Sequence, residues 1–423
     1  MRTLPPTRRP RPLAAALCAL ALAGAAHGQD GPLDRLDDAL AFGGSDDAVR
    51  ARLSGTLDLE GYYLRQPAPG LIFSEGNRIF NPRLSLFLDG QLGQHLYAFV
   101  ETRADNGFDP GEAGPSLRLD EYVLRLTPWE DGRFNLQIGK FATVVGSWSP
   151  RHLSWDNPFV SAPLPYENLT GIWDTTAARA ANEVLAWAGL LPRPGHGGAY
   201  LEPYNDVPVI WGPSYASGAA ALGAVGRFDY ALELKNASLS SRPETWSPTE
   251  TQWQHPTVSG RLGYRPDEMW SLGVSASAGT YLQPSAGPTL APGAGLGRYR
   301  EIVVGQDIGF AWHHVQVWAE VYEARFQIPQ VGNADTQAYY VEAKLKFTPQ
   351  LFGALRWNQQ LFSTLPGATG AGRWGRDVER VDIAPGYRLT PHVQVKLQYS
   401  IERQEADLQR WGDMVAAQLT ARF

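Results

Sequence analysis

The strongest constraint in this sequence is a one-by-one alternation of apolar and polar residues that recurs from about Ala51 to Phe423. The run 270–279 reads WSLGVSASAG, and the run 393–401 reads VQVKLQYSI. Successive side chains of a β-strand point to opposite faces, so each run has one apolar and one polar face. The sequence therefore predicts an all-β fold built from amphipathic strands.

The lengths of the runs and of their connections favour a membrane barrel over a soluble sandwich. The runs reach about 10 to 12 residues, which crosses a bilayer when the strand is tilted, whereas sandwich strands average about 5 to 6. Short connections such as 127–128, 348–349 and 390–391 alternate with long ones such as 143–171 and 283–297. This is typical of short periplasmic turns and long extracellular loops. We expect a transmembrane, antiparallel, up-and-down β-barrel over residues 51–423.

The hairpin pattern predicts about 18 strands, with both termini on the periplasmic side. Segments 170–178 and 183–191 carry the weakest pattern, and the count falls to 16 if they form a helix or a loop. The expected strands are 51–64, 81–90, 94–104, 117–127, 132–142, 170–178, 183–191, 213–225, 228–239, 254–265, 269–282, 300–311, 314–326, 336–348, 351–363, 377–390, 392–404 and 412–423.

Composition agrees with a barrel and argues against other classes. Mean hydropathy is −0.27, and the chain carries 14 Trp and 44 Gly. A formal net charge of −6, without a block of like charge, makes nucleic acid an unlikely class of partner. The only cysteine is Cys18. We therefore expect no disulfide, no thiolate metal site and no attached haem in the mature chain, and we predict no cofactor.

The N-terminal residues 1–28 fit a cleaved signal peptide. Several arginines precede an apolar stretch from Leu13 to Ala26, which is too short to span a bilayer, and Ala26-His27-Gly28 fits a cleavage site. A retained membrane anchor is the alternative. Residues 29–50 then form a periplasmic segment, in which leucines at 33, 36 and 40 follow helical spacing. A short helix and a solvated tail both fit that spacing.

The long connection 143–171 is the best candidate for a loop that folds into the barrel and constricts it. A barrel of 16 to 18 strands is too wide for side chains to fill, so function lies in the lumen lining and in inward loops. Aromatic side chains would anchor this loop, and charged ones would narrow the pore. An external loop capping the barrel mouth is the alternative. The candidate constriction residues are Trp148, Arg151, His152, Trp155, Asp156 and Glu167.

Strand parity places a basic patch on the lumen face of the C-terminal strands. Acidic residues on the same faces are Glu342, Asp382 and Glu402. Such a patch would favour anions through several weak sites, whereas charge-paired residues would only rigidify the wall. The predicted patch consists of Lys344, Lys346, Arg356, Arg380, Arg388 and Lys396, with Arg422 on the same face.

Two local motifs complete the pattern. The last strand, 415–423, alternates and ends in Phe423, which resembles the assembly signal of bacterial outer-membrane barrels. The segment Ile138-Gly139-Lys140-Phe141, followed by Gly146, ends a strand before the candidate inward loop. With the hairpin pattern, these features resemble the porin superfamily of proteobacteria, and in particular the phosphate-selective-type porins. That resemblance implies homotrimers of 16-stranded barrels.

We therefore expect an outer-membrane porin for small hydrophilic solutes, with a mild anion preference. Its expected partners are outer-membrane lipid, lipopolysaccharide and the barrel-assembly machinery. A carbohydrate or carboxylate substrate remains open. A sheath around a partner, such as an electron-transfer cytochrome or an exported polymer, is the alternative. An outer-membrane enzyme is disfavoured because no Ser/His/acid trio converges in the strand map.

Overall fold

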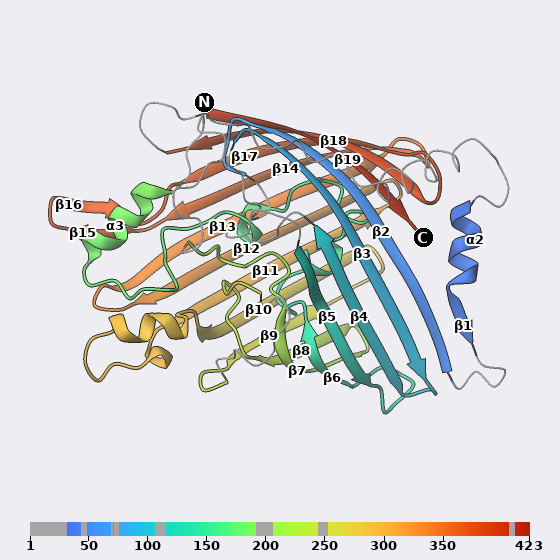
Figure 1. Ribbon diagram of the computed structural model, residues 1–423, viewed down its shortest axis with the longest axis horizontal. Helices are drawn as coiled ribbons and strands as arrows, with labels where there is room; N and C mark the ends of the chain where they lie inside the picture. The colour runs from blue at the N-terminus through green and yellow to red at the C-terminus, as the bar shows by residue number, and fades with distance from the viewer. Residues whose placement is uncertain are drawn as a thin grey trace, which may run out of the picture.

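The protein forms a closed antiparallel barrel of sixteen strands, β2–β14 and β17–β19, in which sequence neighbours pair (Figure 1). The computed structural model describes residues 32–43, 49–68, 71, 76–105, 116–191, 206–243, 253–405 and 411–423. The strands are β2 (Val49–Leu64), β3 (Arg78–Leu92), β4 (Leu96–Asp105), β5 (Ser116–Leu126), β6 (Asn135–Phe141), β7 (Ala216–Val225), β8 (Phe228–Lys235), β9 (Thr257–Tyr264), β10 (Trp270–Thr280), β11 (Arg300–Trp312), β12 (Val315–Ile328), β13 (Gly332–Lys346), β14 (Leu351–Phe362), β17 (Val378–Arg388), β18 (Val393–Gln404) and β19 (Trp411–Arg422).

The two ends of the barrel differ in their connections. One end, called the short-turn end below, joins strands through segments such as 93–95, 226–227 and 313–314. The opposite, long-loop end carries longer connections, among them 142–215 and 363–377. The latter contains a small hairpin of β15 (Thr364–Gly367) and β16 (Gly370–Arg373). In Figure 1 this hairpin projects from the left, so the short-turn end lies at the right.

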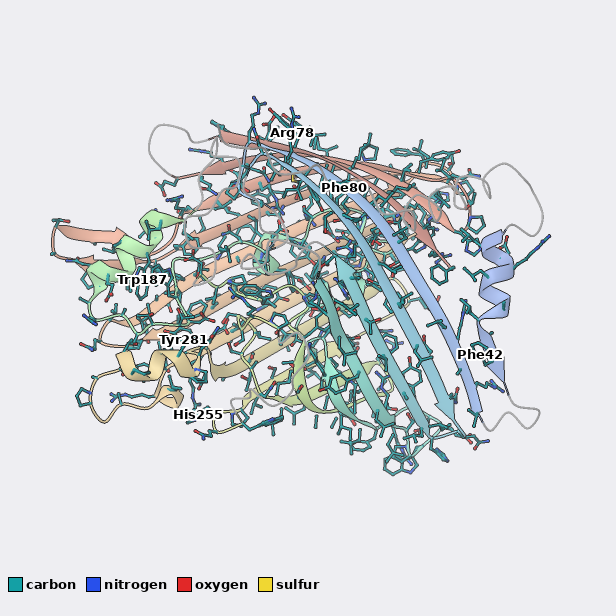
Figure 2. All side chains as sticks on the ribbon, in the orientation of Figure 1. Phe42, Arg78, Phe80, Trp187, His255 and Tyr281 are labelled. Atoms are coloured by element: carbon teal, nitrogen blue, oxygen red, sulfur yellow. The ribbon has the colours of Figure 1, made fainter. Side chains whose placement is uncertain are left out.

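Alternation in the sequence becomes two unlike faces of one wall, as the exposure of the side chains drawn in Figure 2 shows residue by residue. Apolar side chains on the outer face stay exposed, for example Val274 at 54% and Leu397 at 57%. Their strand neighbours Ser275 and Gln398 are buried inside the barrel. Exposed aromatic residues gather on the outer face near both ends of the strands. They are Phe228, Trp270, Trp312 and Phe347 at the short-turn end, and Tyr63, Phe80 and Trp411 at the long-loop end.

The prediction of 18 strands was wrong by two, because segments 170–178 and 183–191 are not barrel strands. The first is irregular, and the second lies largely in helix α3 (Ala181–Leu190). The helix sequence ANEVLAWAGL is rich in good helix formers, and it buries Val184, Trp187 and Ala188 at helical spacing. The Glu183 carboxylate accepts a hydrogen bond from the Arg179 backbone N–H at 2.7 Å, which satisfies a donor at the helix start.

First and last barrel strands meet at a seam, where β19 pairs with β2 from Met414↔Leu64 to Arg422↔Thr56. Phe423 extends this ladder, because its backbone exchanges hydrogen bonds of 2.9 and 3.0 Å with Gly55. Beyond that point strand β1 (Ala41–Gly43) pairs with β2. A short outer strand thus continues the sheet where β19 stops.

Helix α2 (Pro32–Ala39) precedes β1 and lies at the short-turn end (Figure 1). Leu33 packs against Val393 and Ala421, and the Asp34 carboxylate lies 2.8 Å from His392 Nε2. The predicted signal peptide, residues 1–28, falls outside the described residues. Among the described residues, no helix combines the length and apolarity needed to cross a bilayer.

The seam generates a stability prediction at Gly55. A Cβ added there would lie 2.7 Å from the Phe423 ring and 2.9 Å from the Ser85 backbone oxygen, so the wall would have to shift. Gly55→Ala should lower the temperature at which the barrel unfolds in heat-modifiability electrophoresis. Gly61→Ala, on the same strand with nothing within 4 Å of the added Cβ, is the matched control. Equal behaviour of the two variants would contradict tight packing at the seam.

Candidate functional site: the inward loop and the lumen wall

The connection from β6 to β7, residues 142–215, folds into the barrel, and we call it the inward loop. Its described parts are 142–191 and 206–215. Figure 1 shows its green trace running through the space enclosed by the strands. Side chains and backbone groups of the loop bond to inward-facing residues of β5, β8, β10, β12, β13, β14, β17 and β18. The loop is therefore attached to the wall from β5 to β18.

Glu320 of β12 is the first attachment point. Its carboxylate accepts hydrogen bonds from the backbone N–H of Trp148 at 3.0 Å and from the Tyr166 hydroxyl at 2.7 Å. The Ser147 hydroxyl donates to the same carboxylate at 2.9 Å. Trp148 and Tyr166 also pack ring to ring, with centroids 4.5 Å apart. A buried carboxylate is stable only with several donors, and the loop supplies them here.

Two arginines on neighbouring strands form the second attachment. Arg356 of β14 donates to the Asp382 carboxylate at 2.8 Å and to the Ser161 carbonyl at 3.2 Å. Arg380 of β17 pairs with the carboxylate of Glu167 in the loop, and donates to the Ala162 carbonyl at 2.6 Å. Both guanidinium groups are almost completely buried, with side-chain exposures of 0% and 2%.

Lys396 of β18 provides the third attachment. Its ammonium group donates to three backbone carbonyls of the loop, those of Ser154, Asn157 and Phe159, at 2.7, 2.8 and 3.0 Å. An ammonium group has three donors, so this arrangement uses all of them. The adjacent Gln398 accepts from the Val160 backbone N–H at 2.7 Å. Side chains of β18 thus hold the backbone of the loop between residues 154 and 160.

The structure divides the predicted basic patch into two groups. Arg356, Arg380 and Lys396 face inward but bind the loop, whereas the remaining three lie nearer the short-turn end. Of these, Lys344 covers the Phe352 ring at 4.3 Å, and Lys346 is exposed. Arg388 and Arg422 lie over the ring of Trp155, which points from the loop toward this end, at 5.2 and 4.0 Å.

Other predicted constriction residues occupy distinct places in the loop. Arg151 pairs with Glu342 at 2.6 Å and covers the Trp318 ring at 4.2 Å. Asp156 is exposed beside Trp155. The structure thus brings Trp148, Arg151 and Glu167 together with the wall, and leaves Asp156 open to solvent.

His152 is held in its neutral form. Its Nε2 lies 2.8 Å from the Tyr215 hydroxyl and its Nδ1 lies 2.6 Å from the Ser149 carbonyl. The carbonyl can only accept, so Nδ1 donates and Nε2 accepts from Tyr215. Burial, reinforced by the nearby Arg103 charge, lowers the pKa of His152 to about 3. Protonation would therefore reverse the direction of the Tyr215 hydrogen bond and place a charge in the loop.

The part of the wall formed by β2–β5 carries an ion-pair network. Most of its residues were not among the predicted site residues. The pairs include Arg83–Asp58 at 3.2 Å, Arg103–Glu101 at 2.8 Å and Arg118–Asp105 at 2.8 Å. Asp120, the extra residue of a β-bulge, pairs with both Arg103 and Arg118. The inward parity used for the C-terminal strands would have found these arginines.

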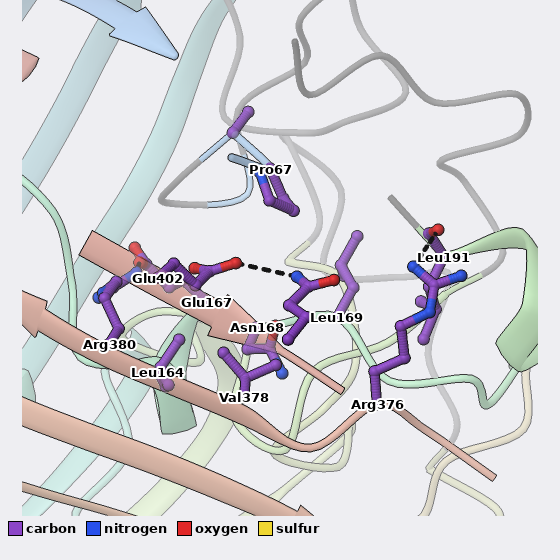
Figure 3. A pocket seen from close by; sticks show the side chains of 12 residues that line it. Pro67, Leu164, Glu167, Asn168, Leu169, Leu191, Arg376, Val378, Arg380 and Glu402 are labelled. Atoms are coloured by element: carbon purple, nitrogen blue, oxygen red, sulfur yellow. Dashed lines mark hydrogen bonds and ion pairs between the residues drawn. The ribbon is translucent and has the colours of Figure 1, made fainter. Parts of the chain in front are cut away.

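Two of the cavities in the described part of the chain lie beside the inward loop. The larger, about 80 Å³, lies between the loop and the β2–β4 wall, and its lining includes Glu60, Arg83, Arg103, Trp148 and His152. The smaller, about 30 Å³, lies toward the long-loop end (Figure 3). Glu167, Arg380 and Glu402 line it, and Figure 3 also shows Arg376 reaching the Leu191 carbonyl at 2.7 Å. No group of three or more His, Cys, Asp or Glu residues suited to a metal ion occurs within the described ranges.

Solved structures of similar shape identify the type of barrel. The chain superimposes on the Salmonella typhi OmpF complex with daunomycin with a TM-score of 0.56 at 12% identity, covering 90% of this chain and 100% of that one. The outer-membrane channel DcaP of Acinetobacter baumannii gives 0.55 at 11%, covering 90% and 99%. The anion-selective porin from Comamonas acidovorans gives 0.54 at 11%, covering 89% and 100%. The fold is that of a porin barrel.

Sequence comparisons add no closer relationship, because no protein-family model and no curated protein matches the chain. The porin resemblance stated from the sequence thus holds at the level of the fold. The phosphate-selective subtype stays a prediction.

Lys396 yields a prediction about loop attachment. Lys396→Met removes three donors and leaves three carbonyls without them, at a cost of about 1.5–3 kcal/mol for each charge-assisted bond lost. In a planar bilayer we expect larger and noisier single-channel currents, because the loop leaves the lumen part of the time. Lys346→Met loses the same charge from an exposed position on β13. It controls for the effect of charge on current size, and its current noise should stay at the wild-type level. Unchanged currents in Lys396→Met would show that the loop does not limit flow.

His152 yields a prediction about pH. Its pKa is lowered in the folded protein relative to about 6.5 in an unfolded chain, so the unfolded state binds the proton more tightly. Stability of the inward conformation should therefore be full above about pH 6.5 and decline as pH falls toward 3. Current noise should rise between pH 7 and pH 4.5 in the wild type. His152→Gln should remove the part of the rise that belongs to this residue; an identical rise in both proteins would assign it to carboxylates.

Proposed function

We propose that this protein is an outer-membrane channel of the porin type, through which small hydrophilic solutes diffuse passively. An apolar outer band between two sets of aromatic residues is the surface that a lipid-embedded barrel presents. Polar inward faces suit a water-filled lumen. A signal peptide over residues 1–28 accounts for export in this proposal.

The observation that carries the proposal is the attachment of the inward loop to the wall from β5 to β18, which leaves a cavity against β2–β4. Glu320, Arg356, Arg380 and Lys396 fix the loop to β12–β18, while the cavity lies against β2–β4. A loop attached to the wall in this way narrows a wide barrel but leaves space between the loop and β2–β4. Constriction by the loop is therefore the role we assign to Trp148, Arg151 and Glu167.

A sheath around a cytochrome or a polymer fits this lumen less well. Such a partner would need the space that the inward loop occupies. If the loop were displaced, the buried Lys396 would lose the three loop carbonyls that accept from it, and Arg380 would lose the Glu167 carboxylate. Leaving a buried charge unpaired is strongly destabilising. The channel is therefore the better proposal.

A mild anion preference is the finer part of the proposal. Of the predicted basic residues, Lys346, Arg388 and Arg422 lie near the short-turn mouth, and they would raise the local concentration of small anions. Arg356, Arg380 and Lys396 contribute little to selectivity in this view, because carboxylates and carbonyls of the protein already satisfy them. Phosphate selectivity, assembly as a homotrimer, and contacts with lipopolysaccharide and the assembly machinery remain proposals from the sequence.

Bilayer recordings test both levels. The purified, refolded protein should give discrete current steps in KCl, and a salt gradient should give a reversal potential of the sign expected for anions. Lys346→Gln with Arg388→Gln should shift that potential toward cations. The same loss of charge at the long-loop end, Arg298→Gln with Arg300→Gln, should shift it less. Absence of current steps would refute the channel; cation selectivity of the wild type would refute only the anion preference.

A further inference from the structure

Glu402 of β18 differs from two other buried carboxylates beside the inward loop. Glu320 accepts hydrogen bonds from three loop residues, and Glu167 pairs with Arg380. Glu402 is 4% exposed, yet within the described residues it forms no ion pair and accepts one hydrogen bond, from Gln404 Nε2 at 2.9 Å. A buried charge without a counter-charge is strongly destabilising, so an ionised Glu402 needs a partner that these contacts do not supply.

The second oxygen of the Glu402 carboxylate opens to the 30 Å³ cavity at the long-loop end (Figure 3). Gln404 Nε2 binds Oε1, whereas Oε2 has no donor among the described residues and keeps surface toward the cavity. A charged acceptor therefore faces this space without a protein partner.

Asn168 of the inward loop lines the same cavity and provides a second acceptor. The Gln360 amide is oriented by its Nε2, which donates to the Thr336 hydroxyl at 3.3 Å. Its Oε1 then accepts from Asn168 Nδ2 at 2.8 Å, which leaves Asn168 Oδ1 without a donor in the described part of the chain. The lining thus presents two oxygen acceptors, of which one is charged.

Two arginines in the lining do not neutralise Glu402 by contact. Arg380 is held by the Glu167 carboxylate. Arg376 donates to the Leu191 carbonyl at 2.7 Å, and Figure 3 shows it well apart from Glu402. Within the described residues, neither guanidinium group forms an ion pair with Glu402. The missing counter-charge must therefore come from outside the protein.

The size and charge of the cavity select the kind of counter-ion. A volume of about 30 Å³ has room for about two water-sized particles, so it excludes a large organic cation. Carboxylate and amide oxygens are ligands that hard cations prefer. One unpaired carboxylate matches one positive charge, whereas a divalent ion would leave excess positive charge beside Arg376 and Arg380.

We infer that Glu402 and Asn168 form a binding site for a small monovalent cation, such as potassium, which serves as the counter-ion of the buried carboxylate. The site goes beyond the proposed channel function and does not depend on it. The bound cation would cancel a negative charge next to the place where Arg380 holds the inward loop.

The test measures the stability of the purified, folded barrel in a nonionic detergent. Thermal unfolding is followed by tryptophan fluorescence while potassium chloride replaces N-methyl-D-glucamine chloride at constant ionic strength. Glucamine is too large for the cavity, whereas an ion that binds only the folded state stabilises it. We expect the unfolding temperature of the wild type to rise by about 2–5 °C from pure glucamine to pure potassium chloride.

Two glutamate variants locate the effect. Glu402→Gln keeps the shape but removes the charge, and should unfold at the same temperature in both salts. Glu301→Gln is the matched control: Glu301 is 2% exposed and forms no ion pair within the described residues, but it does not line the cavity. Its Oε2 accepts from the Ser240 hydroxyl at 2.8 Å, and its Oε1 is sealed from solvent. Glu301→Gln should keep the potassium effect of the wild type.

Asn168→Ala tests the second acceptor, because it leaves the Glu402 charge in place. It should require a potassium concentration about tenfold higher for the same rise in unfolding temperature. An unchanged potassium dependence in this variant would remove Asn168 from the site.

The other outcomes decide the inference itself. Equal unfolding temperatures of the wild type in the two salts would overturn it, by showing that Glu402 is neutralised by a proton. A potassium effect that persists in Glu402→Gln, or that disappears in Glu301→Gln, would also overturn it. The measurement needs no ion current, so failure of this site and failure of the channel function are separate results.

Discussion

The inward loop stays in the lumen because three cationic side chains on consecutive strands need partners that the wall alone does not supply. Arg356, Arg380 and Lys396 are almost fully buried, and each reaches a backbone carbonyl of the loop. Burying a charge is costly unless it is paired and hydrogen-bonded. Wall and loop are therefore mutually dependent: the loop satisfies the cations, and the cations satisfy carbonyls that would otherwise face the barrel interior without donors.

This dependence divides the lumen wall into two unlike parts. On β12–β18 several buried polar side chains bond to the loop, among them Glu320, Arg380 and Lys396. On β2–β5 the charged side chains pair mainly with one another, as in Arg103 with Glu101 and Arg118 with Asp105. The space that remains lies between these parts, and neither lining presents an excess of free charge to it. The loop therefore sets the width of the remaining space, and the ion pairs of β2–β5 form its charged lining.

The barrel and most of its strands could be predicted from alternation alone. Lipid on one face of each strand and water on the other impose a period of two, which is visible in the local sequence. The two strands predicted wrongly lie in the inward loop, where lipid and water do not impose this period. There, helix propensity and packing around Trp187 determine the conformation of 183–191. Strand parity predicts an inward position for Arg356 and Arg380, and both side chains are buried in the structure. Parity gives no sign that the loop binds both arginines, because the Ser161 and Ala162 carbonyls are backbone groups distant in sequence and follow no sequence pattern.

The N-terminal segment bridges the seam: β1 pairs with β2, while α2 packs through Leu33 on Val393 and Ala421 of the strands on the other side. The contacts of Leu33 join residues several hundred positions apart, so loop-closure entropy delays them until the two edges of the sheet have met. Strand β1 can pair with its sequence neighbour β2 earlier, whereas helix α2 reaches both of its contacts only on a closed barrel. Docking of α2 across the seam therefore favours the closed ring over any open sheet that exposes an unpaired edge.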